Sequence, residues 1–243
     1  MIVLVTDFGL DGPYTGQVRA VLADKAPGIG VIDLFADAPP FDPQAAAYLI
    51  AAYADGFPSG SVFLCVIDPG VGSERRPCCV LAGHRWFIGP DNGLFDVVVR
   101  RAHPHVAAWR IDGRSERASA TFHGRDVFAP VAASLARGGP LPGPPISPQS
   151  LRRFDWPDDL ARIVYVDGYG NAISGMRASM VDGDARITVG GLRLGRARCF
   201  ADVSPGEAFW YENANGLLEI AVNCGRAADD LGLRPGTPVL IET

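Results

Sequence analysis

The sequence predicts an α/β domain followed by a smaller β domain, because the hydrophobic patterning differs between the two halves of the chain. In the first half, apolar and β-branched runs at residues 2–6, 30–35 and 61–67 are typical of strands, and residues 43–54 are typical of a helix. Strands that alternate with helices favour a mainly parallel sheet with helices on its faces. Such a sheet gathers its functional loops at the carboxyl ends of its strands.

The helix expected at residues 43–54 carries a start signal and a helical period. Asp42 is suited to cap it, and Pro43 suits its first position. Apolar residues then recur at nearly helical spacing, at Ala45, Ala46, Leu49, Ile50 and Tyr53. Two more helices are expected, one after residues 91–93 and one after Asp126.

A proline-rich stretch predicts the boundary between the two domains. Between Gly138 and Pro157 the chain has six prolines and three glycines, a composition that suits neither a helix nor a central strand. We therefore expect an N-terminal α/β domain at residues 1–145, a linker at 146–160 and a C-terminal domain at 161–243. Short strands separated by Gly and Asn turns predict a small β-barrel or sandwich there, with strands at residues 162–166, 185–189, 207–211, 217–222 and 238–241.

Composition limits the class of partner. The chain has 243 residues, 48% of them hydrophobic, a net charge of -5 and a pI near 5.3. An acidic chain without a basic tail or helix is a poor ligand for nucleic acid or an anionic membrane, so a small-molecule substrate fits better. No apolar run approaches the roughly 20 residues that a membrane helix needs, and the first residues do not resemble a signal peptide. We expect a cytoplasmic protein.

The cysteines and histidines do not predict a metal site. Five cysteines form no C-x-x-C pair, and the four histidines show no zinc-ligand spacing with them. Cys78 and Cys79 lie in an expected strand, where packing is their expected role, and His84 suits a hairpin turn. We expect reduced thiols and no metal.

Two segments carry groups that could prepare a nucleophile: residues 68–76 (DPGVGSERR) and 121–126 (TFHGRD). Asp68 closes an apolar strand, so its carboxylate needs a partner, which Arg75 or Arg76 could supply. That pair alone could simply stabilise a loop. His123 adds a group for proton exchange; Gly124 allows close approach of another group, and Asp126 is expected to cap the following helix.

Polar residues at two other strand ends suit nucleoside recognition. Asp7 ends the first strand, where a carboxylate can accept the hydroxyl protons of a ribose, although it could also cap a turn. After the first strand of the second domain, Tyr169 could stack on a base and Asn171 could offer a donor and an acceptor to adenine, although a plain turn is the ordinary explanation. Neither the segment at residues 7–11 nor residues 70–72 contains G-x-G-x-x-G or the G-K-[ST] ending of a P-loop.

Five segments in order resemble the S-adenosyl-L-methionine hydroxide adenosyltransferase family, once called DUF62 and related to fluorinase and chlorinase. They are residues 6–9 (TDFG), 68–76 (DPGVGSERR), 89–93 (GPDNG), 122–126 (FHGRD) and 169–171 (YGN). The resemblance covers nearly the whole chain. It implies an N-terminal α/β domain, a C-terminal β-barrel and a homotrimer with active sites between neighbouring subunits.

The resemblance also assigns roles to residues. It implies a catalytic set of Asp68, Arg75 and His123, and a contact from Asp7 to the ribose hydroxyls. It also implies that Phe41 lies beside the sugar and adenine and that Asp167 binds the methionine ammonium. The implied contacts to adenine are Tyr169 and Asn171. Relatives commonly have Asn-Ser in a late motif where this chain has Asn213 and Ala214, which puts a contact to the methionine carboxylate in doubt.

The implied reaction is hydrolysis of S-adenosylmethionine to adenosine and L-methionine by hydroxide attack on C5′ of the ribose, without a cofactor. Free water, with a pKa of about 15.7, must be stabilised as hydroxide or deprotonated as it attacks. Arg75 can only stabilise the hydroxide, whereas His123 can accept the proton; Asp68 would orient the arginine or the imidazole and balance the positive charge. Two alternatives are halide transfer to the same carbon and a ligand-binding sensor without useful turnover.

Overall fold

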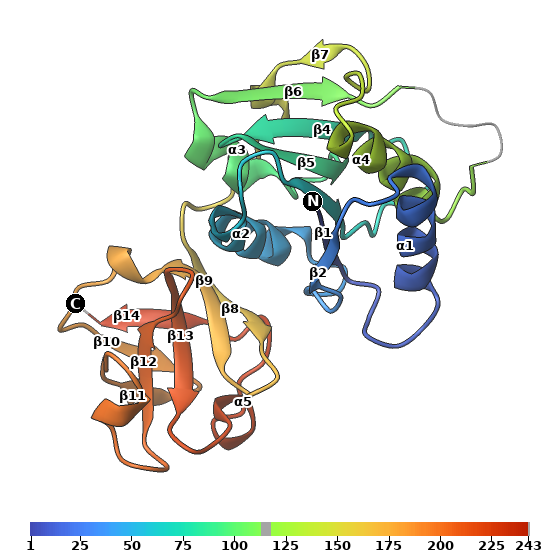
Figure 1. Cartoon of the computed structure of the whole chain (residues 1–243). Helices are drawn as coiled ribbons and strands as arrows, with labels where there is room; N and C mark the ends of the chain where they lie inside the picture. The colour runs from blue at the N-terminus through green and yellow to red at the C-terminus, as the bar shows by residue number, and fades with distance from the viewer. Residues whose placement is uncertain (113–117, 243) are drawn as a thin grey trace. The chain divides into compact units, whose positions relative to one another are not determined.

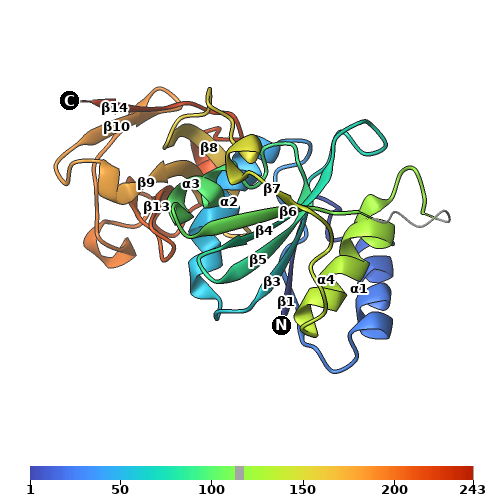
Figure 2. The same ribbon diagram turned by 90° about the horizontal axis from the view of Figure 1, so that it is seen from above.

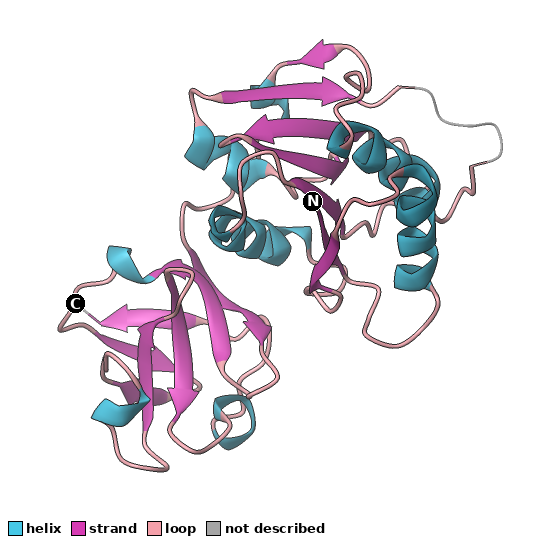
Figure 3. Cartoon of the chain, viewed as in Figure 1, coloured by secondary structure: helices cyan, strands magenta, loops and turns pink. Residues whose placement is uncertain are grey.

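The structure is a computed structural model that describes residues 1–112 and 118–242. The chain divides into two compact units, Met1–Phe154 and Asp155–Thr243, and the division falls within residues 146–160. The first unit contains a sheet with helices, and the second consists mainly of strands (Figures 1 and 3). None of the helices in the described residues is long and apolar enough to cross a membrane.

The first unit is built on a seven-stranded sheet in the order β2-β1-β3-β5-β4-β6-β7. The strands are β1 (Ile2–Thr6), β2 (Val31–Phe35), β3 (Val62–Val66), β4 (Pro77–Ala82), β5 (Arg85–Pro90), β6 (Val106–Arg110) and β7 (Pro145–Ile146). The four strands β2, β1, β3 and β5 are parallel, and the remaining three pairings are antiparallel. The predicted α/β class is confirmed.

Helices cover both faces of this sheet. They are α1 (Tyr14–Lys25), α2 (Pro43–Tyr53), α3 (Asp96–Ala102) and α4 (Ala129–Ala136). α1 and α4 lie side by side on one face, and α2 and α3 lie on the other (Figure 2). Every residue of β1 and β3 is buried, as expected for strands covered on both sides. Asp42 caps α2 as predicted, since its side chain accepts from Ala45 N at 2.9 Å.

The helix α1 was not among the expected elements; it buries only Val18 and Leu22 and so has a weak apolar pattern. The predicted hairpin residue His84 is confirmed. β4 and β5 are joined by Gly83 and His84, and both have positive φ, 54° and 64°. This is the backbone that a two-residue hairpin with a type I′ turn requires.

The second unit contains two antiparallel sheets, in the orders β11-β10-β14 and β12-β13-β9-β8. Its elements are β8 (Leu160–Val166), β9 (Ala172–Arg177), β10 (Arg186–Val189), β11 (Leu192–Leu194), β12 (Ala208–Glu212), β13 (Leu217–Val222), β14 (Val239–Glu242) and the short helix α5 (Ala227–Asp230). β9 and β11 were not among the expected strands. A shared core surrounds the buried Trp210.

The described strands of the second unit stop short of the closed barrel that the family resemblance implied. Single bridges, Arg162 with Pro238 and Arg196 with Trp210, join the edges of the two sheets. These bridges link the seven strands in a closed order, but continuous ladders of backbone hydrogen bonds run only within each sheet. Both bridging positions, Pro238 and Arg196, lie outside the named strands, so a ladder does not extend across either junction.

Candidate active site

Two neighbouring parallel strands of the first unit end beside each other and position the site. β1 and β3 pair in register, with Thr6 opposite Val66 at their carboxyl ends. Asp7 directly follows β1, and Asp68 follows β3 after one further residue. A hollow of about 110 Å³ lies here, lined by Asp7, Phe8, Phe41, Val66, Asp68, Val71, Thr121, Phe122, His123 and Gly124.

Asp68, Arg75 and His123 form a continuous chain of contacts beside this hollow. Arg75 Nε donates to Asp68 Oδ1 at 2.9 Å, and Arg75 Nη2 donates to Asp68 Oδ2 in the same fork. The same Nη2 lies 2.8 Å from His123 Nδ1. The Arg75 and Asp68 side chains are only 9% and 4% exposed, so the pair is largely removed from water. The structure thus brings together the three residues expected to act on water.

The direction of the contact between arginine and histidine is fixed by chemistry. A guanidinium has five N–H donors and no acceptor, so His123 Nδ1 accepts from Arg75 Nη2. A neutral His123 ring in this contact therefore carries its proton on Nε2. The lone pair of Nδ1 is already engaged. Arg75 must release it before the ring can take a proton from water.

Local hydrogen bonds turn the chain so that Arg75 lies on Asp68. Ser73 Oγ donates to Gly70 O at 2.7 Å and accepts from Arg75 N at 3.3 Å, which tightens the loop between the two charged residues. The Arg75 guanidinium also lies 5.3 Å from the centre of the Phe128 ring, in a favourable cation–π contact. The loop and the aromatic ring together restrict the position of the guanidinium.

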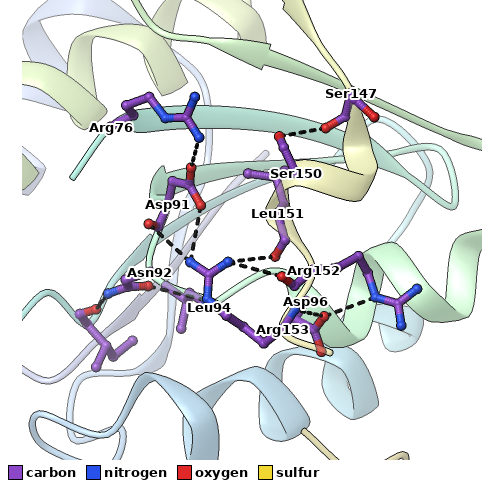
Figure 4. A network of polar contacts seen from close by, with 11 residues as sticks. Arg76, Asp91, Asn92, Leu94, Asp96, Ser147, Ser150, Leu151, Arg152 and Arg153 are labelled. Atoms are coloured by element: carbon purple, nitrogen blue, oxygen red, sulfur yellow. Dashed lines mark hydrogen bonds and ion pairs between the residues drawn. The ribbon is translucent and has the colours of Figure 1, made fainter. Parts of the chain in front are cut away.

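Arg76, the alternative to Arg75, points to a different carboxylate. Arg76 Nη2 donates to Asp91 Oδ2 at 2.9 Å, and Arg153 Nη2 contacts the other oxygen of Asp91 at 3.3 Å (Figure 4). The Asp91 side chain is 7% exposed and that of Arg76 is 52% exposed. It is Arg75, therefore, that the structure places on Asp68, and Arg76 anchors the end of the same loop to Asp91.

Asn92 holds the strand end next to Asp68, a role that the sequence analysis did not assign. Its Nδ2 donates to Ile67 O at 2.9 Å, and its Oδ1 accepts from Leu94 N at 3.2 Å (Figure 4). Ile67 directly precedes Asp68, so this amide fixes the backbone from which the carboxylate extends. The available signal was the polar turn at residues 91–93, directly after β5.

The segment around His123 differs in part from the prediction. A Cβ on Gly124 would lie 3.1 Å from the Phe8 ring, which confirms that this glycine permits a close approach. The expectation that Asp126 caps the next helix is wrong. Its carboxylate accepts from Ser119 N at 2.8 Å and pairs with Arg125 at 2.7 Å, inside a π-helical turn at Gly124–Phe128. It closes the preceding loop because Ser119, rather than a helix N–H, lies within its reach.

Asp7 and Phe41 lie together at the hollow. Phe41 N donates to Asp7 Oδ2 at 3.2 Å, and the Phe41 side chain is 77% exposed. Phe41 has a φ of 59°, which strains a bulky residue and suggests a functional site. Burial raises the pKa of Asp7; the negative charge of Asp68 adds to this effect, and the Phe41 N–H opposes it.

Asp167, Tyr169 and Asn171 form a tight turn in the second unit. Asp167 Oδ1 accepts from Tyr169 N and from Asn171 N, both at 2.9 Å, and these two contacts close the turn. Tyr169 is 81% exposed, whereas Asn171 is buried. The other oxygen, Asp167 Oδ2, accepts from Asn171 Nδ2 at 3.4 Å.

The late motif of the second unit is a second turn of the same kind. Asn213 Oδ1 accepts from Asn215 N at 2.9 Å and from Leu217 N at 3.0 Å. Ala214 lies exposed at its tip. The turn forms with alanine at position 214, so this departure from the expected motif leaves the turn itself in place.

Three of the five cysteines pack in the interior of the first unit. Cys65, Cys78 and Cys79 are buried in strands, and burial raises the pKa of Cys65 and raises that of Cys79 to about 12. Across the described ranges, no group of three His, Cys, Asp or Glu side chains is arranged to hold a metal ion.

Comparisons with known proteins show the family to which the chain belongs. Residues 2–143 match the model of the SAM hydroxide adenosyltransferase N-terminal domain, and residues 161–240 match that of its C-terminal domain. The chain is 40% identical to an (R)-S-adenosyl-L-methionine hydrolase from Thermus thermophilus, with 98% of each chain covered. A solved structure of an uncharacterized conserved protein from Thermotoga maritima is similar, with a TM-score of 0.89, 32% identity and full coverage of both chains. A fluorinase from Nocardia brasiliensis is 23% identical, over 100% of this chain and 96% of the relative.

Proposed function

This chain belongs to the SAM hydroxide adenosyltransferase family, and we propose that it hydrolyses S-adenosyl-L-methionine to adenosine and L-methionine. The hydrolase from Thermus thermophilus, similar over nearly the whole chain, supports this reaction. The observation that carries the proposal is the buried contact chain of Asp68, Arg75 and His123 beside the hollow.

The reaction requires a nucleophile more than it requires an acid. A C5′–O bond forms while the C5′–S bond breaks, and the electron pair stays on sulfur, so methionine leaves as a neutral thioether. One proton is released to solvent as water becomes the new hydroxyl group. The step uses only S-adenosylmethionine and water, and we propose that no further cofactor takes part.

We assign Arg75 and His123 to the stabilisation of the attacking hydroxide. Arg75 supplies positive charge and N–H donors, and Asp68 holds the guanidinium through its two-point contact. Because His123 Nδ1 accepts from Arg75, the neutral ring offers its Nε2–H as a second donor. His123 acts as a base, as the sequence analysis suggested, only if the contact with Arg75 opens.

Substrate contacts follow the family resemblance. We propose that Asp7 binds the ribose hydroxyls beside Phe41, that Asp167 binds the methionine ammonium, and that Tyr169 and Asn171 contact adenine. Buried or turn-fixed polar groups suit this task because their orientation is set before the ligand arrives. The proposal includes a cytoplasmic homotrimer with sites between neighbouring subunits. Light scattering on the purified protein would test the trimeric state.

The direct test is product analysis. Purified protein incubated with S-adenosylmethionine, without added metal or halide, should form adenosine and methionine in equal amounts. Parallel incubations with chloride or fluoride separate hydrolysis from the chemistry of the fluorinase relative, because a halogenase would form a 5′-halogenated nucleoside. Adenosine no higher than in the enzyme-free control would contradict the proposal and would favour a binding protein without turnover.

A further inference from the structure

The segment at residues 89–93 (GPDNG) lies against the catalytic loop, residues 68–76, and the proposed reaction does not use it. Its first residue, Gly89, belongs to β5, and a Cβ there would lie 2.3 Å from Cys65 O in β3. Glycine therefore allows the two backbones to approach closely. Its last residue, Gly93, has a φ of 99°, a conformation that favours glycine and turns the chain. The two glycines thus place the residues between them beside the end of β3.

Asn92 supplies a hydrogen bond at the carboxyl end of β3. The ladder between β3 and β5 covers residues 62–64 of β3, so Ile67 lies beyond it. There the side chain of Asn92 replaces the ladder, since its Nδ2 donates to Ile67 O at 2.9 Å while its Oδ1 accepts from Leu94 N (Figure 4). Ile67 is fully buried, so its carbonyl needs a donor from the protein. Asn92 is such a donor.

Asp91 holds the other end of the catalytic loop through its backbone. Asp91 N donates to Arg76 O at 2.8 Å. The Asp91 side chain contacts Arg153, and Arg153 N in turn donates to Asp96 Oδ1 at 2.8 Å, at the start of α3 (Figure 4). Because the contact with Arg76 O is made by backbone atoms, it does not depend on the Arg76 side chain. The segment is therefore fixed both to the loop and to α3.

Holding both ends of the loop fixes the two charged groups that it carries. Asp68 directly follows Ile67, and Arg75 directly precedes Arg76. The two-point contact between them requires both carboxylate oxygens to face Nε and Nη2 of the guanidinium. A displacement of about 1 Å at a catalytic group can cost about 10²-fold in rate, so the backbone on either side of this pair must be held firmly.

We propose that Asn92 is a positioning residue for the hydrolysis, and that it holds Asp68, and through it Arg75, where hydroxide is stabilised. The inference rests on the proposed function. Asn92 acts through the backbone of Ile67 and not by contact with the substrate. If the amide served only to satisfy a buried carbonyl, its removal would lower the stability of the protein and leave the rate of the folded protein unchanged.

The test is a double-mutant cycle on single-turnover rates at saturating S-adenosylmethionine. Asn92→Ala removes the donor to Ile67 O, and adenosine formation should slow about tenfold, the effect of roughly one hydrogen bond. In an Arg75→Ala background the same substitution should change the rate by less than about twofold, because the guanidinium that it positions is absent. The affinity of Asn92→Ala for adenosine, measured by calorimetry, should stay near the wild-type value.

Asn223→Ala is the matched control. Asn223 Nδ2 also donates to a backbone carbonyl, Val203 O at 2.8 Å, but it belongs to the second unit. The substitution therefore removes the same kind of hydrogen bond without affecting the catalytic loop. Asn223→Ala should lower the temperature of thermal unfolding and keep the wild-type single-turnover rate.

The outcomes separate this inference from the proposed function. Wild-type protein that forms no adenosine from S-adenosylmethionine would overturn both. With an active wild type, a folded Asn92→Ala protein of unchanged rate would overturn the inference alone, as would an equal loss of rate in Asn223→Ala or in the Arg75→Ala background. If Asn92→Ala shows no cooperative thermal transition, Asn92→Asp replaces it, since the carboxylate can still accept from Leu94 N and loses only the donor to Ile67 O. A wild-type rate in Asn92→Asp would also overturn the inference.

Discussion

The two polar sites of this protein are assembled in different ways. In the first unit, Arg75 contacts a carboxylate seven positions away and an imidazole 48 positions away. In the second unit, the Asp167 and Asn213 turns are closed by contacts that span two to four positions. Charged groups are thus brought together by the fold of the first unit, whereas amides in the second unit are set largely by local turns.

This difference predicts that changes in the first unit alter the reaction rate, whereas changes in the second unit alter ligand affinity. Displacing a charged group in the first unit should mainly slow the chemical step, because its charge is needed where hydroxide attacks. Altering an amide in the second unit should mainly weaken binding, because in the proposed function it contacts a part of the ligand that does not react. Three measurements test this division, and a fourth concerns the stability of the first unit.

The largest effect is expected for Arg75. Arg75→Ala removes the charge beside the hollow and leaves Asp68 without its partner, so the single-turnover rate should fall about 10²- to 10³-fold. Arg76→Ala is the matched control, because Arg76 pairs with Asp91 and is half-exposed. Its rate should stay within a few-fold of wild type. An equal loss in the two folded variants would move the assignment away from Arg75.

His123 distinguishes a hydrogen-bond donor from a base. His123→Ala should slow the single-turnover rate by about 10²-fold, as for removal of one donor to a developing charge. His123→Gln keeps an N–H donor and should recover part of that loss. If His123 is instead the base, the glutamine cannot take up a proton, and the two variants should be equally slow.

Asn171 should affect affinity with little effect on rate. Asn171→Ala leaves buried hydrogen-bond partners unpaired, so adenosine binding should weaken by roughly 1–3 kcal/mol, or about 5- to 150-fold. Calorimetry measures the affinity, and single-turnover kinetics at saturating substrate measures the rate. Wild-type affinity in the folded variant would remove Asn171 from the site.

Asp7 should give the smallest effect, and it concerns stability. Its pKa is raised mainly by burial from the ordinary value of 3.8, so the folded protein holds this proton more tightly than the unfolded chain. The resulting stabilisation is present below that value and is lost as the pH rises through the folded pKa. Asp7→Asn should therefore raise the free energy of unfolding at pH 7 relative to wild type, and the gain should shrink toward pH 4. Urea unfolding at the two pH values measures this; an equal difference at both would contradict the linkage.

Local patterns were sufficient for much of the first unit. The continuous apolar runs at β1 and β3 predicted buried strands, because strands covered on both faces have no polar side. Asp42 and Pro43 predicted the start of α2 through the free N–H groups of a first helical turn. By contrast, α1 has few buried residues, so its sequence shows too little hydrophobic periodicity to predict a helix.

The sequence by itself determined which side chains were available: a carboxylate after a buried strand, two adjacent arginines and a histidine in a glycine-containing turn. Only the tertiary structure decided their partners. Arg75 and Arg76 carry the same guanidinium group, but the conformation of the loop places Arg75 on Asp68 and Arg76 on Asp91. Likewise, β13 is apolar in sequence apart from the buried Glu219, and the donors to that carboxylate, Tyr211 Oη and Asn213 Nδ2, are brought to it only when β12 pairs with β13. Hydrophobic periodicity is a local property, whereas the pairing of charges depends on which distant backbones the fold brings within a few ångströms.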